Sequence, residues 1–269
     1  MNPIAIELYA SNGIDITKEY LECAVCAQHN NGGLMGNIWW ESNLKHFFPA
    51  GEINGSFGVY RPGGSALNAT QTGGRRAAQY IARHYNTAPD IQAVDCIQEN
   101  VTKIFEFIDK ITKNPPSECE VPVLKAEVQQ NMSTNGAHIR SLASAEKGIA
   151  FCLDRLAKLE NELSVTSLDC LPEVFKTKNI LLTQLAYLHT IAKYIQDGGQ
   201  SRGSYLVTAS EAMDADIQID SANSSRALIT EFGCDLSVKC RWEDIRPIPE
   251  EDNWFENVWR KYRDGEVFK

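Results

Sequence analysis

The sequence predicts a mainly helical α+β fold, in which a small β-containing piece is followed by a bundle of helices. Apolar residues recur three and four positions apart through residues 90–113, which is typical of a helix with one buried face. Before about residue 86, the apolar runs are short and are separated by Gly and Asn, as strands are. We therefore expect three parts, with boundaries at residues 1–86, 87–200 and 201–269.

The first part is expected to combine short strands with one long helix. Three runs rich in β-branched, aromatic or small apolar residues predict strands over residues 21–29, 37–42 and 46–52. A helix follows from Ser65, a residue type that caps helix N-termini well, to about residue 84.

The middle part is expected to be a helical bundle. The helix over residues 90–113 stops at Pro115-Pro116, because proline cannot continue a helix. Periodic apolar residues predict further helices over about 121–134, 143–163 and 171–197, the last closed by Gly198-Gly199. The tail returns to mixed signals, with a strand over 237–242 and a short aromatic helix over 253–265.

Composition and charge limit the possible partners and location. The 269 residues are 43% hydrophobic and 23% charged, with a net charge of -9, which argues against nucleic acid or an anionic membrane surface as the main partner. The most apolar long stretch, residues 179–195, is interrupted by Gln184, His189 and Lys193, so no membrane insertion is expected. Eight cysteines in a chain of this length do not indicate a disulfide framework, and no secretory signal is recognisable. A cytoplasmic protein is expected.

A glycine-rich loop precedes the helix that begins at Ser65. Gly63 and Gly64 permit positive φ angles and the close approach of a ligand. The N–H groups and partial positive charge of the helix start favour a negative or electron-rich group. The first turns carry only small residues on one side, so either a flat cofactor or a closely packed sheet can lie against the backbone. The residues alone leave both interpretations open.

Three segments carry a resemblance to a known family. "HNNGG" (29–33), "FPAGE" (48–52) and "YRPGGSALNATQTGGRRAA" (60–78), in this order and spacing, resemble the C-terminal part of the FAD-binding domain in the fumarate reductase/succinate dehydrogenase flavoprotein family. Downstream, residues 124–141 and "SRGSY" (201–205) are similar to that family's helical domain. The resemblance implies part of an FAD-dependent oxidoreductase that transfers hydride between flavin and a small carboxylate substrate.

The resemblance also implies which residues hold the cofactor. The carboxylate of Glu52 would accept hydrogen bonds from FAD hydroxyl groups, since it presents two acceptor oxygens. Amides near Ala66 and Leu67 would face the N1/O2 edge of the flavin and stabilise the negative charge that collects there. The implied cofactor contacts are Glu52, Gly63, Gly64, Ser65, Ala66 and Leu67.

Three further residues are implied at the substrate. Arg61 stands where the family binds a substrate carboxylate, which suits the planar guanidinium; the alternative is a buried structural ion pair. His29 matches the substrate-side histidine, although such a histidine at the end of an apolar strand is otherwise often structural. Arg202 either reaches the substrate from the helical domain or pairs with an acidic residue at a domain contact.

No metal site is expected. Cys23-x-x-Cys26 lacks partners at ligand spacing, and Cys234 with Cys240 forms only a loose second pair. On a strand, positions three apart point to opposite faces.

Parts of the family's site are missing from the sequence. No G-x-G-x-x-G follows a strand, so the half that would bind the ADP pyrophosphate is absent, and so is the capping domain. We therefore expect FAD in the complete enzyme, with weak or absent binding to this chain alone. Either the chain is a truncated product, or it pairs with a separate chain that carries the N-terminal FAD-binding half. A non-catalytic structural or interaction fragment is the alternative function.

Overall fold

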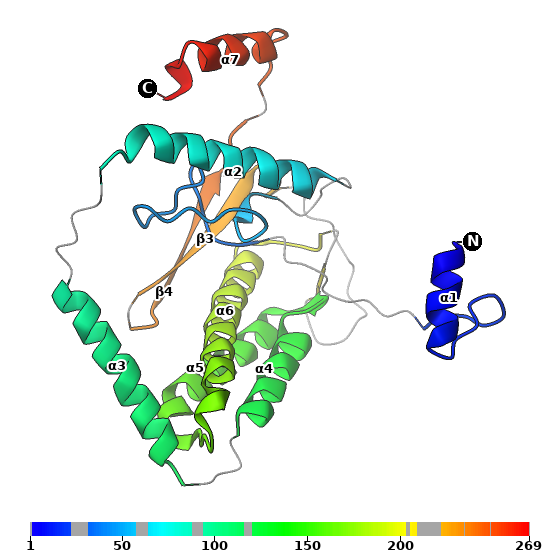
Figure 1. The fold of residues 1–269 in the computed structure, drawn as a ribbon, viewed down its shortest axis with the longest axis vertical. Coiled ribbons are helices and arrows are strands. Elements are labelled where there is room, and N and C mark those ends of the chain that lie inside the picture. Colours follow the sequence, from blue (N-terminus) through cyan, green and yellow to red (C-terminus); the bar gives the residue numbers. More distant parts are fainter. Residues whose placement is uncertain are drawn as a thin grey trace.

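The structure is a computed structural model, and it describes residues 2–22, 32–57, 64–87, 94–115, 120–202, 205–208, 222–233, 235–247 and 249–268. The predicted strand over 21–29 lies almost entirely outside these residues, as do the first four residues of the predicted helix over 90–113. Helices dominate the described residues, with two small two-stranded sheets beside them (Figure 1). The mainly helical α+β prediction is therefore confirmed.

The bundle consists of four helices that the sequence predicted. They are α3 (Val94–Lys113), α4 (Val121–Asn135), α5 (Leu142–Glu162) and α6 (Leu171–Gln196). Helices α4, α5 and α6 pack together, and α3 joins them at its C-terminal end (Figure 1). Their aliphatic side chains form one continuous core, whose most deeply buried members include Ile111, Leu124, Leu163, Leu181, Leu185 and Leu188.

A buried polar network fixes how the bundle helices meet. The amide of Gln184 on α6 donates to the carbonyl of Val128 on α4 at 2.6 Å, and its oxygen accepts from Asn131 at 3.2 Å. Asn135 donates in turn to the side chain of Asn131 at 2.9 Å. Because each buried polar group finds a partner only in this register, the network favours one alignment of α4 against α6.

Helix α2 (Ser65–His84) lies across an irregular segment, residues 32–57. The strands predicted over 37–42 and 46–52 are wrong: these residues form turns, and Trp40 and His46 have positive φ angles of 67° and 68°, which no strand allows. The aromatic residues that suggested strands instead pack against α2, where Trp39 stacks on Tyr80 at 5.5 Å. Only an isolated bridge between Leu34 and Asn54 is strand-like in the described part of residues 2–87.

The tail packs back on both parts. Strands β3 (Arg226–Phe232) and β4 (Val238–Asp244) form an antiparallel hairpin on α6, where the hydroxyls of Thr190 and Thr230 lie 2.6 Å apart. Helix α7 (Trp254–Arg263) contacts α2 through a hydrogen bond of 2.6 Å, which the Gln79 amide donates to the hydroxyl of Tyr262. The predicted strand over 237–242 and helix over 253–265 are thus confirmed.

Besides strand β3, the sequence did not predict one short helix and one pair of short strands. Helix α1 (Pro3–Ser11) stands apart from the bundle at the right of Figure 1, and Asn2 caps it through a hydrogen bond from the Ile4 amide. Strands β1 (Ile139–Arg140) and β2 (Leu206–Val207) pair in parallel and link the end of α4 to the segment that follows α6.

Candidate cofactor site at the start of α2

Two of the motif segments are joined by backbone contacts. The amide of Leu34 donates to the carbonyl of Ile53 at 2.7 Å, and the amide of Gly55 donates to the carbonyl of Leu34 at 2.9 Å. Gly33 lies so close to this second segment that an added Cβ would be 2.2 Å from the Ile53 oxygen. Only glycine fits there, so the end of "HNNGG" is fixed against the residues that follow Glu52.

The segment that carries Glu52 lies against the second turn of α2. Gly51 has a φ of 87°, and a Cβ added there would lie 3.7 Å from the Thr70 methyl group. The buried side chain of Asn54 holds the turn, since it donates to the carbonyl of Pro49 and accepts from the amide of Ser56. Glu52 itself is exposed at this turn. A carboxylate is thus held beside the N-terminal half of α2.

The N-terminus of α2 is open. Gly64 occupies the cap position with a φ of 80° and provides no side-chain cap, and a Cβ added there would meet no atom within 4 Å. The amides of Ala66 and Leu67 lie in the first turn, where backbone N–H groups have no carbonyl acceptor within the helix. Leu67 is 63% exposed. Among the described residues no side chain caps these amides, so a flat and electron-rich group such as a flavin edge could lie against them.

Buried aromatic packing holds α2 in place over this site. The indole of Trp40 lies directly on Gly73, where an added Cβ would be 2.0 Å from the ring. Arg76 places its guanidinium 5.2 Å from the Trp39 ring, and burial lowers the pKa of Arg76, with Arg246 adding to this effect. Gly73 therefore makes room for the Trp40 indole against α2, and Gly64, just before the helix, leaves the helix start without a side chain.

The helical bundle reaches the same region through α6. A Cβ added at Gly32 would lie 3.3 Å from the ring of Tyr187, so the backbone of the "HNNGG" segment passes close to this tyrosine. Burial raises the pKa of the Tyr187 hydroxyl. The contact joins the first part of the chain to the bundle at the edge of the candidate site.

Arg202 lies in a turn that Arg140 supports. Arg202 and Tyr205 exchange two backbone hydrogen bonds, of 3.0 and 3.3 Å. The guanidinium of Arg140 lies 4.2 Å from the Tyr205 ring centre, and its Nε donates to the carbonyls of Gly136 and Ala137. Burial lowers the pKa of Arg140. The sequence did not single out Arg140, because its contact with Tyr205 spans more than sixty residues of chain; its only signal was its place at the end of the 124–141 stretch.

The predicted site residues fall into three groups. His29, Arg61 and Gly63 lie outside the described residues, as do Cys23, Cys26 and Cys234. The structure brings together the segment of Glu52 and the start of α2, from Gly64 through Ser65 and Ala66 to Leu67. Arg202 lies on a separate segment, where its role stays a prediction.

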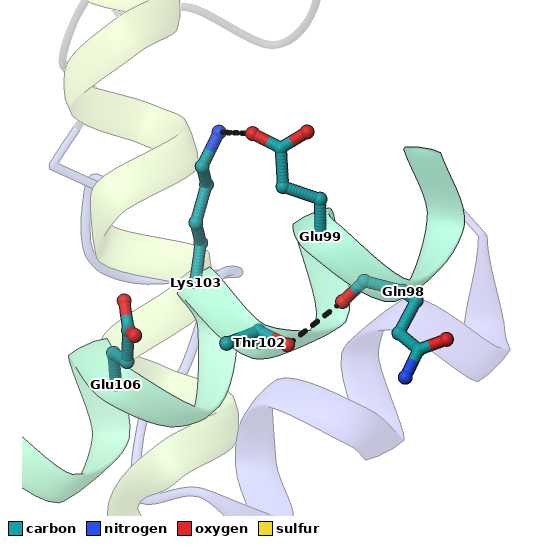
Figure 2. Close-up of a pocket in the computed structure, with 5 residues that line it drawn as sticks. All are labelled: Gln98, Glu99, Thr102, Lys103 and Glu106. Atoms are coloured by element: carbon teal, nitrogen blue, oxygen red, sulfur yellow. Dashed lines mark hydrogen bonds and ion pairs between the residues drawn. The ribbon is translucent and has the colours of Figure 1, made fainter. Parts of the chain in front are cut away.

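Two hollows on the surface of the described residues lie elsewhere. Figure 2 shows one of about 370 Å³ along a single face of α3, lined by Gln98, Glu99, Thr102, Lys103 and Glu106. Another, also of about 370 Å³, lies between α5, α6 and β4 and includes His189 and Cys240. Neither contains a predicted site residue. In the part of the chain that the structure describes, no three metal-ligating side chains gather, and none of its helices has the length and apolar character needed to cross a bilayer.

The structure thus defines a mainly helical α+β protein in which the Glu52 segment lies beside α2. Comparison with known proteins narrows this class. The chain is 31% identical over 197 residues to a fumarate reductase (CoM/CoB) subunit of Methanothermobacter marburgensis, covering 72% of this chain and 34% of the relative. It is 29% identical over 178 residues to an uncharacterized FAD-dependent oxidoreductase of Methanocaldococcus jannaschii, covering 63% of this chain and 30% of that protein. No protein-family model matches.

Solved structures agree on the fold. The FrdA subunit of E. coli quinol fumarate reductase superimposes with a TM-score of 0.71 at 18% identity, over 93% of this chain and 43% of that subunit. A quinol-fumarate reductase with menaquinol molecules gives a TM-score of 0.74 at 17% identity, with the same coverage. The Mycobacterium smegmatis Sdh1 complex gives 0.56 at 22% identity, over 76% of this chain and 33% of that one.

The chain is therefore similar in sequence to part of a fumarate reductase subunit and of an FAD-dependent oxidoreductase, and in fold to part of the FrdA subunit of fumarate reductase, as the motif resemblance predicted. It spans about a third of the length of the curated relatives that it matches.

Proposed function

We propose that this chain provides the flavin-facing and helical part of an FAD-dependent oxidoreductase that transfers hydride between flavin and a small carboxylate. The observation that carries the proposal is the series of contacts that joins Gly33 to the segment of Glu52, and that segment to the second turn of α2. The first turn of α2 is partly exposed, so its amides are accessible to a ligand.

The proposed cofactor contacts follow from this geometry. Glu52 accepts hydrogen bonds from FAD hydroxyl groups, and the amides of Ala66 and Leu67 donate to the N1/O2 edge of the flavin. Gly63, Gly64 and Ser65 would place no bulky side chain in front of these amides, so that the flavin could contact the backbone directly. When bound, FAD supplies the flavin N5 that exchanges hydride.

Arg61, His29 and Arg202 are proposed to act on the substrate. The guanidinium of Arg61 would bind both oxygens of a carboxylate, and His29 would donate to the same substrate. A small carboxylate fits the names of the relatives, of which one is a fumarate reductase. Arg202, next to the turn that Arg140 and Tyr205 hold, would reach the substrate from the helical side.

A separate chain is proposed to complete the site. The sequence contains no G-x-G-x-x-G motif for the ADP pyrophosphate, and it matches only about a third of each curated relative. A partner that carries the nucleotide-binding half would supply the missing contacts, and this chain alone would then contact only the flavin end of FAD.

A flavin titration tests this division directly. We expect the purified chain to bind FAD and FMN with dissociation constants within roughly threefold of each other and weaker than about 1 μM, because only flavin-side contacts are present. AMP should not compete. Glu52→Ala should weaken both ligands about tenfold, a loss of about 1.4 kcal/mol. Glu256→Ala, at an exposed acid of α7, is the matched control and should change nothing.

The outcomes separate the candidate functions. Sub-micromolar affinity for FAD with strong preference over FMN would show that the chain holds a complete dinucleotide site, against the proposal. The absence of saturable binding by either flavin even when the partner is added, with the protein folded by circular dichroism, would favour the non-catalytic fragment.

Arg61→Lys tests the substrate role in the enzyme completed by its partner. Lysine keeps the charge but lacks the planar pair of donors, so turnover should fall roughly tenfold or more, equivalent to about 1.4 kcal/mol of transition-state stabilisation. The melting temperature should hardly change, since such a swap at a ligand-facing position usually alters stability by less than about 0.5 kcal/mol. A large loss of melting temperature with unchanged turnover per folded molecule would instead identify a structural ion pair.

A further inference from the structure

Helix α3 carries a regular apolar seam. Its β-branched side chains alternate four and three positions apart, the spacing of the a and d positions of a coiled-coil heptad. We call this set the α3 seam; its members are Ile97, Val101, Ile104, Ile108 and Ile111. Such spacing fits packing against another helix, because it keeps one narrow stripe facing the partner over several turns.

The C-terminal part of the α3 seam is already occupied within the chain. Ile111 is fully buried, and its carbonyl accepts from the Val165 amide at 3.2 Å. Nearby, Asn114 donates to the carbonyls of Glu160 and Leu163, and Phe107 packs on Phe175 with ring centres 5.8 Å apart. These contacts anchor α3 at its last two turns.

The N-terminal part of the same seam is exposed. Ile97 is 55% exposed, Val101 44% and Ile104 47%, and Phe105 beside them is 65% exposed. In Figure 1 the upper half of α3 runs away from α4, α5 and α6, while its lower end meets them. The apolar stripe therefore continues from the core onto a stretch of helix that no described residue covers.

The charges of α3 lie on its other side. Glu99 pairs with Lys103 at 2.6 Å, on the polar face seen in Figure 2, and Asp109 pairs with Lys113 at 2.6 Å. The positions that flank the exposed seam are the uncharged Gln98, Asn100 and Phe105. Heptad helices that select a different partner usually do so through charges at these flanking positions, and α3 has none.

We propose that the exposed half of the α3 seam pairs with the same segment of a second copy of this chain. Two copies with a net charge of -9 each can meet here without placing like charges opposite one another. The pairing is antiparallel, because each α3 has its own bundle attached at its C-terminal end. Antiparallel helices place the two bundles at opposite ends and also align the helix dipoles favourably.

The interface is short, so the dimer is expected to be weak and dependent on concentration. The stretch from Ile97 to Phe105 spans about 12 Å of helix, given a rise of about 1.5 Å per residue. Small interfaces of this kind fall at the low end of specific association.

Sedimentation equilibrium of the full chain tests the pairing. We expect the average mass to rise with concentration from 30.0 kDa towards twice that value. Val101→Glu should raise the dimer dissociation constant at least about tenfold, because each dimer would bury two unpaired carboxylates. The control is Val123→Glu on α4: Val123 is 46% exposed, close to the 44% of Val101, and its replacement should leave the dissociation constant unchanged.

Mixing two variants tests the orientation. In the antiparallel pair Val101 faces Ile104 of the other copy, so Val101→Glu mixed with Ile104→Lys should dimerise again, whereas each variant alone stays monomeric. A mass of one chain at all concentrations, or equal weakening by Val123→Glu, would overturn the proposal. Rescue of Val101→Glu by Val101→Lys but not by Ile104→Lys would overturn the antiparallel arrangement. Circular dichroism of each variant verifies that the helices remain folded.

Discussion

Two adjacent glycines of α2 should respond in opposite directions to the same substitution. A Cβ added at Gly73 would lie 2.0, 2.1 and 2.2 Å from three atoms of the Trp40 indole, whereas one added at Gly74 would meet no atom within 4 Å. Ordinary contact begins near 3.4 Å, so Gly73→Ala must displace the indole by about 1.4 Å. Trp40 is buried between α2 and residues 32–57, so it cannot move without disturbing that packing.

The expected free energies follow from these distances. Overpacking of a buried ring costs about 3 kcal/mol at this degree of overlap, and alanine regains about 1 kcal/mol in helix propensity. Gly73→Ala should therefore lower the free energy of unfolding by about 2 kcal/mol. Gly74→Ala obtains only the propensity gain and should raise it by about 1 kcal/mol. The two neighbours should differ by about 3 kcal/mol.

Urea unfolding monitored by tryptophan fluorescence and by far-UV circular dichroism measures both variants. With unchanged m-values, the shift in midpoint gives the change in stability. The reasoning fails if Gly73→Ala is as stable as the parent protein or more so, because Trp40 could then not lie on α2 as described. Equal destabilisation by both alanines would instead indicate that α2 does not form over these residues.

Two further predictions concern pH and the bundle core. The Tyr85 hydroxyl donates to Glu41, and this hydrogen bond raises the pKa of Tyr85 to about 12. Because the folded pKa exceeds the unfolded value of about 10, stability should fall as pH rises between these values, and Tyr85→Phe should remove that fall in urea midpoints measured at about pH 9 and 11.5. Gln184→Ala deprives the Val128 carbonyl and Asn131 of their partner in the core and should cost about 2–4 kcal/mol by urea unfolding. Thr183→Ala, at the exposed neighbouring position, should cost less than about 0.5 kcal/mol, and similar losses for the two variants would refute a role for the network.

The helices could be predicted because their signals are local. The apolar period and the flanking Pro and Gly residues predicted helices over 121–134, 143–163 and 171–197, and α4, α5 and α6 agree within one residue at each end. Helix α1 escaped prediction because it buries no side chain, so its sequence shows no one-sided apolar pattern.

The strand predictions over 37–42 and 46–52 were wrong because contacts with residues far away in the sequence determine the backbone conformation there. Trp39, Trp40 and Phe48 have high strand propensity, yet their partners are Tyr80 and Gly73 on α2. Propensity reflects how well a residue fits a half-buried surface, and here a helix provides that surface instead of a neighbouring strand. Nothing within residues 37–52 indicates which of the two will do so.

The candidate site was predictable in part. The motifs identified Glu52 and the glycines before Ser65, but the contacts that bring their segments together are made by backbone atoms of Gly33, Leu34 and Ile53. Backbone contacts leave almost no trace in sequence beyond the requirement for glycine. The support of the Arg202 turn by Arg140 was missed for a related reason, since it depends on the parallel pairing of β1 with β2.

The helix starts of α5 and α2 differ in how the amides of the first turn are capped. At α5, Ser141 and Ser144 bond reciprocally to each other's backbone amides and so satisfy two donors of the first turn. At α2, Gly64 offers no side-chain acceptor, and glycine at a cap position costs only a few tenths of a kcal/mol relative to serine, asparagine or aspartate. A capping side chain would occupy the open space before the amides of Ala66 and Leu67, and it would compete with any ligand for them. Helices α4 and α6 also begin without a side-chain cap, so an uncapped start alone identifies no ligand, and the proposed flavin contact at α2 rests on the motif resemblance and on the Glu52 segment beside this helix.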